Sequence, residues 1–172
     1  ISLVPVNPLT EKSSTIRPGC LLLCFRNLNT IALLDWAEKK LAWHWGPGLL
    51  QHPHFPTVLE NGHILVFDNG VNRKYSRVVE VDPATGQIVW QYHARIKSEF
   101  FSPTKGSAQR LANGNTLICN ADHGQAFEVT VEGEVVWEWW SAIVEEKSWL
   151  GVQQVCRMPS PAADTSTNPA RP

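Results

Sequence analysis

The 172-residue sequence lacks the features that mark several classes of protein. Its 15 Lys and Arg residues balance 16 Asp and Glu residues, so no excess of positive charge is present to attract nucleic acid or an anionic membrane. Its apolar runs stay far below the roughly 20 residues of a membrane-spanning helix. The chain starts at Ile1 without the basic and apolar regions of a signal peptide. We therefore expect neither nucleic acid nor a membrane among its partners.

Cysteines are few, and their spacing is unlike that of a metal site. Cys20, Cys24, Cys119 and Cys156 form no C-x-x-C pair and no cluster with histidines, so we expect no zinc site. Residues four apart on one strand lie about 13 Å apart, which excludes a disulfide between Cys20 and Cys24. We expect small buried thiols, and a bridge from Cys119 or Cys156 to another strand stays open.

What the sequence does have is an internal repeat with a period of 47 residues. Trp43, Trp90 and Trp137 are separated by this interval, and each ends a segment of alternating apolar residues. A second aromatic follows each of them two residues later, on the same face of a strand: Trp45, Tyr92 and Trp139. We expect these tryptophans to pack between sheets and not to form a substrate cage.

A second element recurs between the tryptophans. Residues 58–67 and 110–119 each carry Asn-Gly between two apolar alternating runs, which predicts a hairpin with a type I′ turn. Each period then contains four short antiparallel strands, the signature of a β-propeller blade. A β-sandwich is the rival architecture, but it predicts no regular recurrence at 47 residues.

The repeat predicts an all-β fold, a partial β-propeller of about three four-stranded antiparallel blades, open rather than closed. We expect an irregular segment at 1–16, three blades at 17–140, the stub of a further blade at 141–157, and a mobile polar tail at 158–172. Closed propellers have four to eight blades, so two sheet edges should be exposed. Three alternatives are open for these edges: they pair with the remaining blades of a longer chain, they pair with a second copy, or they lead to aggregation.

The densest group of candidate functional residues is Gln51-His52-Pro53-His54, which holds two of the six histidines. Histidines at i and i+2 on a strand point the same way, but no third ligand stands nearby, so we predict no metal site. Arg26, in the polar stretch 26–29, can direct two donors at a sulfate, phosphate or carboxylate. The plainer alternative is that the histidines are loop residues and that Arg26 pairs with a surface carboxylate.

Two further polar segments are assigned no part in the candidate site. Asp68-Asn69-Gly70 has the chemistry of a turn, so a structural role is favoured there. Lys105 and Arg110 flank Gly-Ser-Ala-Gln, and this context predicts no role for either of them.

Taken in order, several segments resemble the arylsulfotransferase family. The resemblance covers residues 17–140 and rests on a series of motifs: Phe-Arg-Asn-Leu-Asn-Thr-Ile at 25–31, Gln-His at 51–52, Leu-Glu-Asn-Gly at 59–62, Ile-Leu-Val-Phe-Asp-Asn-Gly at 64–70, Tyr-Ser-Arg-Val-Val-Glu-Val-Asp at 75–82, Phe-Ser-Pro at 101–103 through Gly-Ser-Ala-Gln-Arg-Leu at 106–111, and Asn-Gly-Asn-Thr-Leu-Ile at 113–118.

The resemblance implies a propeller, commonly six-bladed and often periplasmic or secreted, that moves a sulfuryl group between phenols without a nucleotide donor. The partners would be an aryl sulfate and a phenol, and no cofactor is implied. His52 resembles the histidine that is transiently sulfurylated, and Arg26 resembles an arginine that binds sulfate oxygens. We predict that Gln51, His54 and Asn29 contact the substrate.

The chemistry is consistent with these residue types. A neutral imidazole is a good nucleophile near neutral pH and a tolerable leaving group afterwards. An arginine supplies fixed donors to the sulfuryl oxygens. The alternatives are a non-catalytic propeller segment that acts as a binding or assembly scaffold, and a truncated product without activity. A concave site shared by His52 and Arg26 would favour the enzyme.

Overall fold

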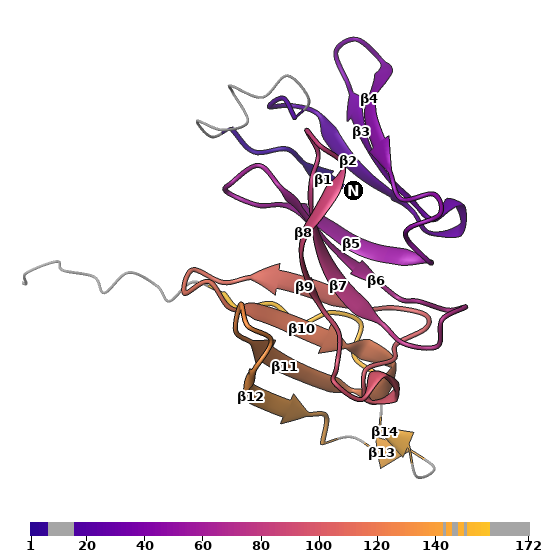
Figure 1. The fold of residues 1–172 in the computed structure, drawn as a ribbon, viewed down its shortest axis with the longest axis vertical. Helices are drawn as coiled ribbons and strands as arrows, with labels where there is room; N and C mark the ends of the chain where they lie inside the picture. The colour runs from indigo at the N-terminus through magenta and orange to yellow at the C-terminus, as the bar shows by residue number, and fades with distance from the viewer. Residues whose placement is uncertain (7–15, 143, 146–147, 150, 159–172) are drawn as a thin grey trace, which may run out of the picture.

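The computed structural model describes residues 1–6, 16–142, 144–145, 148–149 and 151–158. In this part of the chain three four-stranded antiparallel sheets follow one another along the long axis of the molecule (Figure 1). Their strands keep chain order and are β1 (Ser2–Leu3), β2 (Leu21–Phe25), β3 (Thr30–Asp35) and β4 (Lys40–Trp45); β5 (Pro53–Val58), β6 (Ile64–Asp68), β7 (Arg77–Asp82) and β8 (Gln87–Tyr92); β9 (Ser107–Arg110), β10 (Thr116–Asn120), β11 (Gln125–Val129) and β12 (Val135–Trp140).

Each 47-residue repeat of the sequence corresponds to one four-stranded blade of the structure. Each repeated tryptophan lies on the fourth strand of its sheet and faces a residue of the third strand, in the pairs Leu33 with Trp43, Glu80 with Trp90, and Glu128 with Trp137. The strand register shifts immediately after the third-strand residue in all three sheets. The prediction of three four-stranded blades in an open arrangement is confirmed.

Each pair of neighbouring blades shares a hydrophobic core, because alternation along the strands turns one apolar face to each neighbour. Between the first and second sheets the core includes Leu22, Ile31, Leu33, Ile64, Val66 and Val79. Between the second and third sheets it includes Leu65, Phe67, Val78, Phe100, Ile118 and Phe127. Phe100 meets Phe67 and Phe127 edge-on, at ring-centroid distances of 5.5 and 5.4 Å.

The Asn-Gly hairpins form, but the type I′ turn predicted for them is wrong. At the first hairpin the Gly62 N–H donates to Leu59 O, and the Leu59 N–H donates to His63 O. Gly62 has a φ of 81°, whereas Asn61 is not among the residues with positive φ. This is a three-residue loop in which only the glycine takes the left-handed conformation. The hydrogen bonds of the second hairpin, at residues 111–115, are the same.

The ends of the described chain differ from the expected division. Residues 1–16 were expected to be irregular, but β1 pairs with Leu21 and Leu22, where it meets backbone groups of β2 that need partners. Within 141–157, expected as the stub of a further blade, residues 151–157 form no regular strand. A short hairpin, β13 (Val144–Glu145) with β14 (Ser148–Trp149), precedes them. The predicted tail lies outside the described residues from position 159 onward.

Residues 151–157 nevertheless follow the third sheet closely. The Val152 N–H donates to Ala121 O at 3.0 Å, and Arg157 Nη2 lies 2.8 Å from a carboxylate oxygen of Glu128. The pair Arg110 and Glu80 makes the same kind of contact, at 2.8 Å, between the third and second sheets. The segment therefore lies against the third blade much as β9 lies against the second.

All four cysteines are free; Cys20 and Cys119 are buried as expected, whereas Cys24 is half-buried and Cys156 is exposed. Burial raises the pKa of Cys24 and of Cys119 to about 11, so neither is a thiolate near neutral pH.

The packing role predicted for the tryptophans holds for the first two blades but not for the third. Trp45 is 8% exposed, and Trp90 Nε1 donates to Val131 O of the next blade at 2.8 Å. Trp137 and Trp139 on β12 are 42% and 43% exposed.

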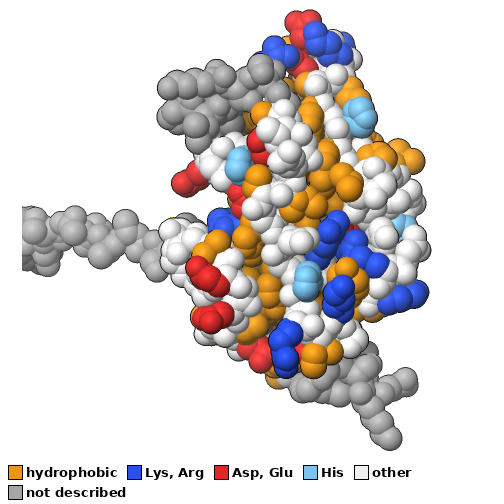
Figure 2. All heavy atoms as spheres, in the orientation of Figure 1, with side chains coloured by type: hydrophobic (Ala, Val, Ile, Leu, Met, Phe, Trp, Pro, Cys, Tyr) orange, Lys and Arg blue, Asp and Glu red, His pale blue; other side chains and the backbone are white. Residues whose placement is uncertain are grey.

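Apolar side chains also reach the surface between charged ones on the face in Figure 2. No helix in the described residues is long and apolar enough to cross a membrane.

Candidate functional site

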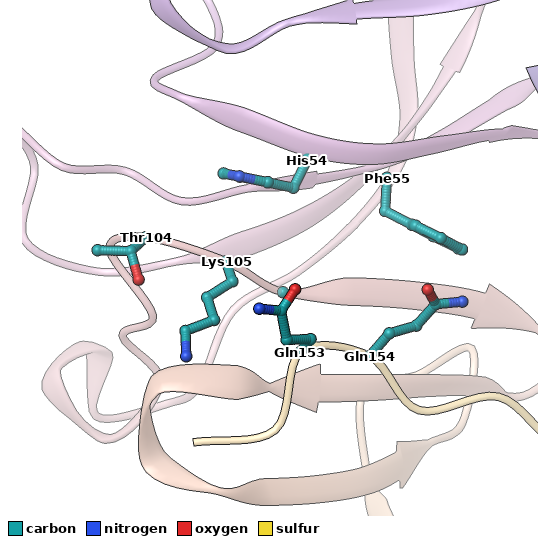
Figure 3. Close-up of a pocket in the computed structure, with 7 residues that line it drawn as sticks. His54, Phe55, Thr104, Lys105, Gln153 and Gln154 are labelled. Atoms are coloured by element: carbon teal, nitrogen blue, oxygen red, sulfur yellow. The ribbon is translucent and has the colours of Figure 1, made fainter. Parts of the chain in front are cut away.

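The candidate site lies where the chain enters the first strand of the second and third blades. A cavity of about 410 Å³ opens between β5, the residues that precede β9, and the segment 151–158. Figure 3 shows His54, Lys105 and Gln153 reaching this space from three different segments of the chain. The cavity is lined by His54, Phe55, Thr104, Lys105, Gly106, Gln153 and Gln154.

His54 is held by one of its two ring nitrogens. Nδ1 lies 2.7 Å from Asn69 Oδ1 and 3.2 Å from the backbone oxygen of His52. Both partners are acceptors, so Nδ1 must carry the hydrogen. In the neutral ring Nε2 then bears the lone pair, and Nε2 is the nitrogen left to react.

Asn69 ties this histidine to the third blade. Its side chain is fully buried, and Nδ2 donates to the backbone oxygens of Ser102, at 2.5 Å, and of Lys105, at 2.8 Å. The structural role predicted for Asp68-Asn69-Gly70 describes Asp68 and Gly70 well. The side chain of Asn69 makes its bonds outside the turn.

Lys105 brings a cation to the cavity. Its Nζ lies 3.9 Å from Asp122 Oδ1, and a Cβ atom on Gly151 would lie 2.9 Å from that Nζ, so the glycine leaves room for the ammonium group. Burial acts to raise the pKa of Asp122, but hydrogen bonds from Thr104 and Ser102 outweigh it, and the pKa falls below 3.8. The carboxylate is therefore charged and faces Lys105.

His52 lies just before β5, in a left-handed backbone conformation with a φ of 53°. The alternation of a strand therefore does not apply to His52 and His54. The His52 N–H donates to Asn29 Oδ1 at 2.8 Å, whereas Nδ1 of its ring is buried with no hydrogen-bond partner among the described residues. Burial lowers the pKa of His52 below 6.5, and the charges of Arg26 and His54 lower it further.

Arg26 and Asn29 lie in the turn between β2 and β3. Arg26 begins a 3₁₀ turn (Arg26–Leu28), and Asn29 closes it with a φ of 52°, a conformation that asparagine tolerates better than most residues. Arg26 Nη1 contacts the neighbouring Asn27 Oδ1 at 3.0 Å. Arg26 and Asn29 are not among the described residues that line the cavity, but the charge of Arg26 reaches His52.

Gln51 is engaged in holding a loop. Its Oε1 accepts the backbone N–H groups of Asn72 and Arg73, each at 3.0 Å, and its own N–H donates to Asp68 Oδ1 at 2.7 Å. Gln51 therefore supports the loop that follows β6, and its side-chain oxygen is not free to receive a substrate. Among the described residues no group of three or more His, Cys, Asp or Glu side chains could hold a metal ion.

The structure groups the predicted side chains differently from the sequence. It places His54 with Lys105 and Asn69, and His52 with Asn29 and, electrostatically, Arg26. Neither Asn69 nor Lys105 was predicted to act at the site. One signal could have found Lys105, because it lies just before β9, the first strand of its blade, and His54 lies at the start of β5, the corresponding strand of the preceding blade.

The stacked four-stranded sheets, with polar residues gathered where the first strands begin, define a segment of a β-propeller. Several solved structures are similar to it. The WD40 β-propeller domain of Doa1 is 17% identical, with a TM-score of 0.54 over 72% of this chain and 37% of that chain. Virginiamycin B lyase from Staphylococcus aureus is 13% identical, with a TM-score of 0.51 over 73% of this chain and 39% of that chain.

At these identities the likeness shows the fold alone, and the chain spans less than two fifths of the length of either structure, at 37% and 39%. Comparison with curated proteins gave no match. The arylsulfotransferase (ASST) family matches residues 7–142, which is well over half of the chain. The chain belongs to this family, and the resemblance read from the sequence is confirmed.

Proposed function

We propose that the site at the start of β5 accepts a sulfuryl group from an aryl sulfate and passes it to a phenol, with a histidine as the carrier. Membership of the arylsulfotransferase family supports this class of reaction. The observation that carries the proposal is the geometry of His54. Asn69 holds its Nδ1, which leaves Nε2 as the nitrogen that can react, and the residue lines a cavity that Lys105 also lines. This geometry favours His54 as the nucleophile over His52, which the sequence favoured.

The transfer balances in two steps. First, the lone pair of His54 Nε2 forms a bond to sulfur while the bond from sulfur to the aryl oxygen breaks, and a phenolate leaves with the electron pair. Next, the oxygen of the acceptor phenol attacks sulfur, the N–S bond breaks, and its electron pair returns to Nε2. The proton that the acceptor loses balances the one that the released phenolate gains. A histidine intermediate divides one difficult transfer into two easier ones.

Lys105 is the cation that the cavity offers to the sulfuryl oxygens, where a fixed positive charge stabilises the negative charge of the transition state. Arg26 stays in the proposal as a second cation, because its charge acts on the neighbouring His52. We assign Gln51 and Asn29 to support of the segment, since their side-chain oxygens already accept backbone N–H groups.

The test is the intact mass of the protein after incubation with p-nitrophenyl sulfate. We expect the wild type to gain the mass of one SO₃ group and His54→Ala to gain none. His44→Ala, which removes an exposed histidine on β4, should keep the adduct and serves as the matched control. Adduct formation by His54→Ala but not by His52→Ala would return the role of nucleophile to His52.

The scaffold alternative gives a different result in the same measurement. If the wild type is folded by circular dichroism and forms no adduct, this segment does not carry out the transfer by itself. Repeating the incubation with a longer chain that supplies further blades then decides whether the family reaction needs them.

A further inference from the structure

The side chain of Asn69 makes hydrogen bonds that the turn after β6 does not need. The turn after β6 begins at Gly70, whose φ is 69° and whose oxygen accepts the Lys74 N–H, and Asn69 itself does not have a positive φ. All three side-chain hydrogen bonds of Asn69 leave the turn. They reach His54 at the start of β5 and the backbone of Ser102 and Lys105 before β9.

These bonds allow the amide of Asn69 only one orientation. Nδ2 faces two backbone oxygens, which accept hydrogen bonds and cannot donate them. Turning the amide over would place its oxygen against both carbonyl groups inside a fully buried site. The oxygen must therefore face His54, and it can only accept a hydrogen from the ring.

We propose that Asn69 is a positioning residue that fixes the tautomer of His54, with hydrogen on Nδ1 and the lone pair on Nε2, facing the cavity. This inference rests on the proposed role of His54 in sulfuryl transfer. The backbone oxygen of His52, 3.2 Å from Nδ1, is the second acceptor of the same hydrogen. In the other neutral tautomer the unprotonated Nδ1 would face two acceptors inside the protein, and Nε2 would carry hydrogen and could not attack sulfur.

An asparagine suits this role better than an aspartate would. The neutral amide oxygen orients the ring without adding a negative charge that would favour a doubly protonated imidazole. A doubly protonated ring has no lone pair on Nε2. The same amide also binds the backbone of Lys105, so it links the nucleophile to the cation of the cavity.

The first test is a nuclear magnetic resonance measurement of the imidazole nitrogens of His54 in the intact wild-type chain, which needs no substrate and no variant. We expect a protonated Nδ1 and an unprotonated Nε2 near neutral pH. A ring protonated on Nε2 instead would overturn the proposal, whether or not the protein transfers sulfuryl groups.

Two variants then assign the tautomer to Asn69. Asn69→Ala should leave a mixture of tautomers, and Asn69→Asp should shift the ring toward the doubly protonated form. Each should slow adduct formation with p-nitrophenyl sulfate by the inverse of the fraction of rings that keep an unprotonated Nε2, roughly two- to tenfold. A His54 ring that keeps the wild-type tautomer in both variants would contradict the proposal.

Asn120→Ala is the matched control. Asn120 is also buried, and its Nδ2 donates to Gln125 Oε1 at 2.8 Å on the third blade. Its loss tests the general cost of removing a buried amide and should leave the His54 tautomer unchanged. If Asn69→Ala does not fold, the wild-type and Asn69→Asp spectra still decide whether Asn69 fixes the tautomer of His54. If no adduct forms in any protein while the tautomers behave as expected, the proposed function fails and the role of Asn69 stands.

Discussion

At the scale of single residues, the same short polar segments build both the loops and the candidate site. Asp68 is fully buried and accepts the N–H of Gln51, while Arg73 and Arg77 approach its Oδ2 at 2.8 and 2.9 Å. This carboxylate fixes the chain at Gln51, just before β5 and three residues before His54. The arrangement of the site therefore depends on an ion pair that makes no contact with the cavity itself.

Replacing Asp68 by alanine should lower the free energy of unfolding by about 3 kcal/mol, since breaking a buried ion pair leaves its charged partners uncompensated. Urea denaturation of the wild type and the variant measures the difference. Glu38→Ala is the control, because Glu38 and Lys40 form an exposed pair at 3.7 Å, and such a loss should stay below about 0.5 kcal/mol. Equal losses in the two variants would mean that Asp68 contributes no more than a surface carboxylate.

At the scale of elements, the approach of the second and third blades depends on a glycine. Gly106 precedes β9 with a φ of 141°, and a Cβ atom there would lie 2.5 Å from the ring of Phe67 on β6. The absence of a side chain lets the chain pass close to the aromatic core between the two sheets. Gly106 also lines the candidate cavity beside Lys105.

Gly106→Ala should therefore destabilise the protein more than an alanine at a glycine in open space does. Gly114 is the matched position, because its φ of 86° is also positive and no atom lies within 4 Å of an added Cβ. We expect the loss at Gly106 to exceed that at Gly114 by about 1–3 kcal/mol, the usual cost of overpacking a core. Thermal or urea unfolding of both variants checks this, and similar losses would show that the Phe67 ring yields without cost.

At the scale of the whole molecule, the free energy of unfolding should decrease in two stages as the pH is lowered. Burial, together with the charges of Arg26 and His54, lowers the pKa of His52 below 6.5, so the folded state binds fewer protons there than the unfolded chain. Stability contributed by the neutral ring is then lost as the pH falls from 6.5 through the folded-state pKa. A hydrogen bond from the Glu38 backbone lowers the pKa of Asp35, and one from the Asn115 side chain lowers the pKa of Glu128. A second loss of stability therefore begins below about pH 4.5.

Urea denaturation at a series of pH values from neutral to acidic measures both stages. His52→Gln should remove the first stage and leave the second, since glutamine does not titrate. A first stage that persists in this variant would assign it to another histidine.

The sequence by itself determined the blades. Strand alternation and the 47-residue recurrence of Trp43, Trp90 and Trp137 are local patterns, and they survive in the structure because each blade buries the same faces against its neighbours. The family also followed from motifs in their order along the chain. Spacing could not show that Ser2 and Leu3 complete the first sheet, because that pairing spans a segment without a pattern.

Only the tertiary structure decided the grouping of the site. Asn69 meets His54 because β6 pairs with β5 in the same sheet. Lys105 shares the cavity with His54 because β9 packs beside β5 and β6, a contact between blades that no spacing within one blade encodes. It also separated the two histidines, since the left-handed backbone at His52 breaks the alternation assumed for a strand. Local sequence sets which residues are available, and the packing of one blade on the next sets which of them share a cavity.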